Sequence, residues 1–115
     1  MTIELSREEY LATAALTAAV TAFLDTGAAP VLLPIFLLVT RYPNRTCAEL
    51  ARLEKVPLAT MSRHLLTLGH VNIGLVRTQT EVGDSRYVRH SLTEKGAALA
   101  KRMAGSLAPK LREAA

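Results

Sequence analysis

The segment from residue 46 to residue 68 constrains the fold of this chain most strongly, because it predicts two short helices joined by a tight turn. Thr46 and Glu49 have the spacing of a capping box, in which the two side chains satisfy free amide groups where a helix begins. The helix should end near Lys55, where Val56-Pro57-Leu58 predicts the turn. Its inward-facing residues are expected to be Leu50 and Leu53.

The second helix of the pair should run from Ala59 to Leu68. Its apolar residues recur at helical spacing on one face, namely Met61, Leu65 and Leu68. The opposite face has small or polar side chains and one cation. It carries Ala59, Arg63 and Thr67, flanked by Thr60 and Ser62. Two helices of this kind indicate a helix-turn-helix, although an antiparallel helical hairpin with a solvated outer face has the same pattern.

The outer face of this helix suits the major groove of DNA. Hydroxyl groups bond phosphates or base edges, and Arg63 can make a bidentate contact to guanine. Leu66 points outward beside Arg63, which favours protein contact instead.

A basic β-hairpin is expected directly after the helix pair. Residues 74–80 read as a strand, residues 82–85 as a turn and residues 86–92 as a return strand, rich in β-formers. Its cations are Arg77, Arg86 and Arg89. A helix-turn-helix followed by a hairpin is the winged-helix order. A last helix, opened by the cap Thr93-Glu94-Lys95-Gly96, should span about 94–107 and break at Pro109.

The N-terminal helix, expected over about 6–26, is apolar on more than one side. Ser6 and Glu9 form its capping box and Gly27 supplies a stop. One stripe holds Leu16, Val20, Phe23 and Leu24, and a second holds Leu11, Ala15, Ala18 and Ala22. A helix of this kind must be covered on two sides. We expect the second stripe to be a dimer interface; the alternative is a helix wrapped entirely by its own chain.

A short buried helix should follow from Pro34 to the turn at Tyr42-Pro43-Asn44. An apolar cofactor pocket is the alternative, but we expect a plain core helix and no cofactor.

Length and charge agree with one small binding domain. The 115 residues correspond to a single domain, and the longest apolar run is too short to span a membrane. No secretory signal is evident, so a cytoplasmic protein is expected. Residues 1–40 carry a net charge of −3 and residues 41–115 a net charge of +7, which indicates a polyanion-binding part joined to an assembly part. The alternative is a chance fluctuation over few charges.

No catalytic or metal-binding constellation stands out. The three histidines, His64, His70 and His90, lack partners at metal-ligand spacing. Cys47, alone in the chain, lies in the first turn of a helix, where the dipole can lower a thiol pKa, so a redox role is the alternative to an inert residue. We therefore expect a protein that is not an enzyme.

Several motifs together resemble the multiple antibiotic resistance regulator (MarR) family. They are Glu49-Leu50-Ala51, Thr60-Met61-Ser62-Arg63, Gly74-Leu75-Val76, Asp84-Ser85-Arg86 and Leu92-Thr93-Glu94-Lys95-Gly96, spread over about residues 34–107. The resemblance implies a dimeric winged-helix transcription regulator, with residues 59–68 as the recognition helix. It also implies that Arg86 enters the minor groove and that Asp84 anchors it. Pro57 departs from the family pattern, since a capping Ser or Thr is usual there.

The sequence therefore predicts a mainly α fold with a small β-hairpin, a winged helix-turn-helix flanked by N- and C-terminal dimerisation helices. Residues 1–115 form one domain, with the helix-turn-helix at about 46–68 and the wing at about 75–92. The expected partners are double-stranded DNA and a second copy of the chain, with no membrane and an effector that the sequence does not identify. The expected DNA contacts are Ala59, Thr60, Ser62, Arg63, Thr67, Arg77, Arg86 and Arg89. The alternative function is a winged-helix module for protein–protein contact.

Overall fold

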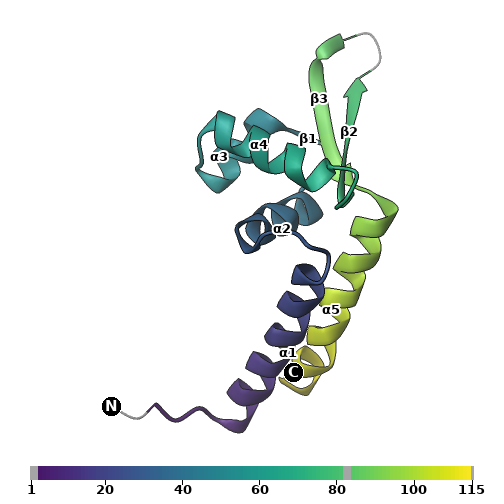
Figure 1. Cartoon of the computed structure of the whole chain (residues 1–115). Coiled ribbons are helices and arrows are strands. Elements are labelled where there is room, and N and C mark those ends of the chain that lie inside the picture. The colour runs from purple at the N-terminus through teal and green to yellow at the C-terminus, as the bar shows by residue number, and fades with distance from the viewer. Residues whose placement is uncertain (1–2, 82–83, 115) are drawn as a thin grey trace.

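The computed structural model describes residues 3–81 and 84–114 of the chain, and the side chains of residues 3–80 and 88–108. The elements in chain order are α1 (Arg7–Leu24), η1 (Pro30–Leu32), α2 (Leu33–Arg41), β1 (Arg45–Thr46), α3 (Cys47–Glu54), α4 (Leu58–Gly69), β2 (Val76–Glu81), β3 (Asp84–Leu92) and α5 (Glu94–Ala114) (Figure 1). The mainly α architecture with a small sheet is therefore confirmed.

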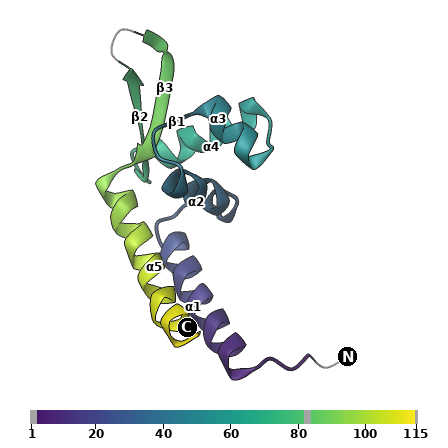
Figure 2. The same ribbon diagram turned by 180° about the vertical axis from the view of Figure 1, so that it is seen from behind.

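The molecule consists of two parts, which can be followed from opposite sides (Figures 1 and 2). α2, α3, α4 and the sheet form a compact head, while α1 and α5 lie side by side and project from it as a stalk. The molecule is accordingly elongated, with principal extents of 55 × 31 × 28 Å. Within the described residues, no helix is both long and apolar enough to cross a membrane.

The core joins the stalk to the head. Phe23 at the end of α1 and Phe36 in α2 are both fully buried, with ring centroids 5.5 Å apart. Leu50 of α3 and Leu75, just before β2, are also fully buried in this cluster. The short buried helix expected after Pro34 is thus a core helix, preceded by a 3-10 turn that begins at Pro30.

Both predicted capping boxes are present. In each, the hydroxyl of Ser6 or Thr46 accepts a bond from the amide of Glu9 or Glu49, and the glutamate returns a bond to the capping residue's amide. α4 begins differently: Pro57, with a φ of −58°, stands at its N-cap without a side-chain bond. The proline ring fixes this backbone angle, so α4 begins without the capping Ser or Thr that is usual at this position.

The wing is a three-stranded antiparallel sheet in the order β1-β3-β2. β2 and β3 form the predicted hairpin, with Val76 opposite Leu92 and Thr78 opposite His90. The predicted turn over residues 82–85 includes two residues outside the description. β1, a two-residue strand against β3, was not predicted, because its length is below what a sequence pattern indicates.

The start of α5 lies directly on the segment that leads into β2. Thr93 donates its hydroxyl to the carbonyl of Gly74, and the same hydroxyl accepts the Gly96 amide at 3.0 Å. The amide of Thr93 bonds the carbonyl of Leu75 at 3.1 Å. The predicted cap of the last helix is therefore confirmed, and it fixes the direction in which the stalk leaves the wing.

Three expectations about these helices are wrong. Leu53 is 48% exposed, because α3 turns Leu50 and Ala51 toward the core instead. Leu16 and Leu24 are exposed, since α1 meets α5 through small residues that allow close approach. Pro109 does not end α5, which continues to residue 114; a proline removes one backbone donor and can be accommodated within a helix.

Candidate DNA-binding surface

α4 presents an outer face with the composition that the sequence indicated. Its inward residues Met61, Leu65 and Leu68 are at most 2% exposed and anchor the helix on the core. Four of the predicted contact residues, Ala59, Ser62, Arg63 and Thr67, are exposed, and Thr60 is half-buried at the edge. The same face carries Leu66, of which 76% is exposed.

Arg63 is available for a ligand. Among the described residues, its guanidinium has no hydrogen-bond or ion-pair partner. The Thr67 hydroxyl, by contrast, donates to the carbonyl of Arg63 at 2.9 Å, one turn back along the helix. This face therefore offers one unengaged cation and several small side chains over which a ligand could approach closely.

Short connections hold α4 at a fixed angle to its neighbours. Lys55 ends α3 in the left-handed region, with a φ of 58°, and Val56 donates its amide to the carbonyl of Ala51 at 3.1 Å. At the other end, the Leu75 amide bonds the Leu68 carbonyl at 2.9 Å, which ties the end of α4 to the start of the wing. The end of α4 is therefore bonded directly to the segment that leads into the hairpin.

Among the predicted contact residues of the wing, the side chain of Arg77 is described, whereas those of Asp84 and Arg86 are not. Arg77 on β2 is exposed, and its Nε donates to the Ser91 hydroxyl at 3.2 Å, which holds the side chain across the hairpin. Asp84 and Arg86 lie on β3, but their side chains are outside the described part of the chain. Their predicted roles as anchor and minor-groove cation therefore stay predictions.

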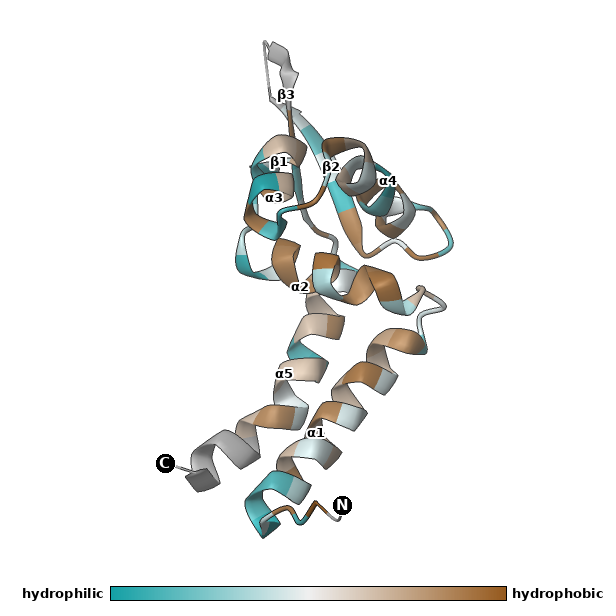
Figure 3. Ribbon diagram, turned by 90° about the vertical axis from the view of Figure 1, so that its left-hand side faces the viewer, coloured by the Kyte–Doolittle hydropathy of each residue, from teal (hydrophilic) through white to brown (hydrophobic). Residues whose placement is uncertain are grey.

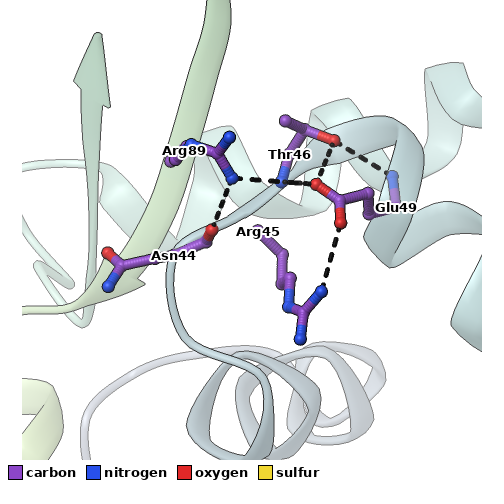
Figure 4. A network of polar contacts seen from close by, with 5 residues as sticks. All are labelled: Asn44, Arg45, Thr46, Glu49 and Arg89. Carbon is purple, nitrogen blue, oxygen red and sulfur yellow. Dashed lines mark hydrogen bonds and ion pairs between the residues drawn. The ribbon is translucent and has the colours of Figure 1, made fainter. Parts of the chain in front are cut away.

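Arg89 takes part in a polar network at the base of the wing (Figure 4). Its Nη1 donates to the carbonyl of Asn44 at 3.0 Å and lies 3.9 Å from Oε1 of Glu49. Arg45 pairs with the other oxygen of Glu49 at 3.3 Å. Glu49 thus serves as the capping residue of α3 and also binds cations from β1 and β3.

This network links elements that are distant in the sequence. Asn44 and Arg89 lie 45 residues apart, and the Asn44 amide also bonds the His90 carbonyl at 2.9 Å. Bonds from the amide and hydroxyl of Thr46, and then the Arg45 guanidinium, hold the pKa of the Glu49 carboxyl below its usual value. Glu49 is therefore anionic near neutral pH and fixes β3 against the first helix of the pair. Sequence reasoning identified its capping role only.

The remaining titratable candidates are structural. His90 is 7% exposed, and its Nδ1 has no hydrogen-bond partner among the described residues. Burial lowers its pKa, so it is neutral near pH 7. Burial raises the pKa of the Cys47 thiol, opposite to the expected dipole effect, and its Sγ lies 3.8 Å from the Leu58 carbonyl. The described part of the chain holds no group of three potential metal ligands.

The predicted dimer residues lie on α1 at different depths. Ala15 and Ala22 are at most 7% exposed, because they pack within the chain on the side that meets α5. Leu11 is half-buried, and only Ala18 is exposed. The predicted stripe is thus largely covered by the chain itself.

The uncovered apolar side of α1 carries Leu16, 53% exposed, and Leu24, 39% exposed. Hydrophobic segments, drawn in brown, recur along α1 in Figure 3. Thr13 and Thr17 lie on the same side and donate their hydroxyls to the carbonyls of Glu9 and Thr13. All four of these residues are exposed in the chain as folded. The alternative in which the chain wraps α1 entirely is therefore wrong.

A helix pair on a core helix, an antiparallel hairpin after it and a helical stalk together define a winged helix-turn-helix. The sequence matches no protein-family model and no curated protein. The fold of this chain is, however, similar to solved structures of MarR regulators. The predicted fold is thereby confirmed as the one found in MarR regulators.

Three of these structures illustrate the similarity. A MarR transcriptional regulator from Methanosarcina mazei Go1 has a TM-score of 0.65 at 24% identity, covering 88% of this chain and 71% of that one. A transcriptional regulator from Thermotoga maritima has a TM-score of 0.70 at 15% identity, covering 90% and 72%. A mutant MarR from E. coli complexed with operator DNA has a TM-score of 0.64 at 19% identity, covering 90% and 73%.

Proposed function

We propose that this chain is a sequence-specific DNA-binding transcription regulator that acts in the cytoplasm as a homodimeric repressor. The observation that carries the proposal is the outer face of α4, where Arg63 is exposed beside small and hydroxyl side chains and has no partner within the described part of the chain. A face of this kind fits the width and the chemistry of the major groove. Similarity to a regulator bound to operator DNA supports the same reading.

In this proposal each subunit sets α4 into one major groove of a pseudo-palindromic site, with the two half-sites about 34–36 Å apart. The hairpin follows the adjacent backbone and minor groove, with Arg77 and Arg86 as its cations. Arg89 acts mainly through its contacts with Asn44 and Glu49, which hold the wing at a fixed angle to α4. Repression follows if bound protein blocks access to a promoter.

A band-shift experiment tests the proposal directly. The full chain is mixed with the duplex upstream of its own coding sequence, with and without an excess of unrelated competitor DNA. A complex that survives the competitor supports specific binding. The second candidate, a protein–protein module, is favoured by the exposed Leu66 and is supported instead if no duplex shifts at low salt.

Arg63→Ala should weaken binding to the specific site by about 1–3 kcal/mol, which is the contribution of one bidentate base contact. Arg63→Lys is the matched variant, because it keeps the charge and loses the planar fork. It should retain nonspecific affinity but not the preference for the site. Fluorescence anisotropy on the site and on a scrambled duplex measures both quantities.

Melting curves complete this test, and neither variant should lower the melting temperature, since Arg63 is exposed. Arg86→Ala is expected to weaken binding to both duplexes more evenly, because the minor groove carries a degenerate code. If Arg63→Ala binds the specific site as tightly as the unchanged protein, α4 is not the reading helix.

Dimerisation is proposed to use the uncovered apolar side of α1, with Leu16 and Leu24 in contact with a second copy. Leu16→Glu should raise the dimer dissociation constant at least about a hundredfold, because burying an unpaired charge costs several kcal/mol. Sedimentation velocity at micromolar concentration measures the change.

Ala18→Glu is the comparison variant for the dimer, because Ala18 is also exposed but lies on a different side of the same helix. We expect it to leave the dimer largely intact. If Ala18→Glu dissociates the dimer and Leu16→Glu does not, the interface is instead formed by the small-residue stripe of Leu11, Ala15, Ala18 and Ala22. An unchanged protein that sediments as a monomer would contradict a homodimer altogether.

A further inference from the structure

Leu66 is a large apolar side chain on the outer face of α4, where the last turn of the helix begins, and it is not part of the buried core. It is 76% exposed, whereas Met61, Leu65 and Leu68 on the same helix are at most 2% exposed. It lies three residues after Arg63 and four after Ser62, so these side chains are neighbours on the helix surface. Its contribution to folding is therefore small, and the Leu66 side chain is free to contact a ligand that binds the outer face of α4.

The major groove of DNA offers one apolar group at the base edges, the C5-methyl of thymine. The other edges present hydrogen-bond donors and acceptors, which a leucine cannot satisfy. Covering such an edge with leucine removes its water without replacing the lost bonds, and this has a cost. A leucine that faces the groove therefore favours thymine and disfavours the other bases at that position.

The spacing on α4 limits where this thymine can lie. Three residues correspond to about 4.5 Å along a helix axis, and successive base pairs are about 3.4 Å apart. Leu66 and Arg63 thus reach the same base pair or base pairs within about two steps of each other. From this juxtaposition we infer that Leu66 is a specificity-determining residue that contacts the methyl group of a thymine beside the guanine bound by Arg63.

This inference rests on the proposed function, and its test separates the two. The full chain is used to select binding sites from a random duplex pool at moderate salt. Each thymine of a selected site is then replaced, one at a time, by deoxyuridine, which differs from thymidine by the missing methyl. Fluorescence anisotropy gives the affinity of each duplex for the unchanged protein and for its variants.

One deoxyuridine in a single half-site should weaken binding of the unchanged protein about three- to five-fold, the effect of one methyl group, and one in each half-site about ten- to twenty-fold. Leu66→Ala should bind the thymine and deoxyuridine duplexes equally. Leu66→Gln should shift the preferred base at that position toward adenine, since glutamine pairs with the adenine edge. Val31→Ala removes another exposed apolar side chain, outside α4 in η1, and should keep full sensitivity to deoxyuridine.

Three results would overturn the inference. Selected sites without a fixed thymine near the guanine would do so, as would a Leu66→Ala variant that still senses the same deoxyuridine. In both cases specific DNA binding stands and only the role of Leu66 fails. If no sequence is enriched at all, the proposed function fails and the inference fails with it. Melting curves should be unchanged for every Leu66 variant, since this side chain is exposed.

Discussion

Gly96→Ala is expected to destabilise the protein by about 1–3 kcal/mol, the usual cost of forcing an extra carbon into a packed site. A Cβ at this position would meet the backbone carbonyl of Leu75, and backbone cannot swing aside as a flexible side chain does. The helix propensity of alanine offsets up to about 1 kcal/mol of this cost. The melting temperature should fall by several degrees in a thermal scan.

Gly105→Ala is the matched control, since it makes the same change on the same helix α5. A Cβ at Gly105 meets nothing within 4 Å. This variant should therefore gain about 0.5–1 kcal/mol from the better helix former. Equal melting temperatures for the two variants would show that α5 does not approach Leu75 as closely as described.

Gly96 also explains one motif that the sequence offered only as a resemblance. In Leu92-Thr93-Glu94-Lys95-Gly96, Thr93 caps α5 and bonds the strand, and Gly96 permits the contact that seats the helix on Leu75. Both residues therefore serve the junction of wing and stalk. Asp84 and Arg86 lie toward the other end of β3, and their role in DNA binding stays a prediction.

Local signals were sufficient where a few neighbouring residues decide the outcome. The capping boxes at Ser6 and Thr46 were predicted correctly because their bonds span three residues. The buried face of α4 was predicted correctly because Met61, Leu65 and Leu68 recur at regular helical spacing and define a single apolar face. The hairpin followed from composition and a turn signal in the same way.

Local signals were insufficient where the answer depends on a distant partner. Arg89 was predicted to contact DNA, and its contacts with Asn44 and Glu49, which come from another part of the chain, were not foreseen. The two apolar stripes of α1 were recognised, but periodicity does not say which one α5 covers. Close helix packing favours small residues, so the alanine side faces inward and Leu16 is left outside.

DNA binding should depend steeply on salt. If a dimer neutralises about 6–10 phosphates through Arg77, Arg86 and neighbouring cations, its affinity should fall roughly 10³–10⁵-fold between 50 and 200 mM salt. The loss reflects the counterions that bound cations release from DNA. Anisotropy titrations at several salt concentrations give the slope, and a flat response would favour the protein–protein alternative.

A pair of charge variants assigns part of that slope to the wing. Arg77→Gln should lower the slope by about one unit for each phosphate contact it removes, and two such contacts are expected in a dimer. Arg41→Gln removes the same charge from α2, where the guanidinium lies 5.6 Å from the ring centroid of Tyr42. Because both variants change the net charge equally, a slope that falls only for Arg77→Gln identifies a phosphate contact. Equal slopes for the two variants would mean that this strand of the wing does not touch the backbone of DNA.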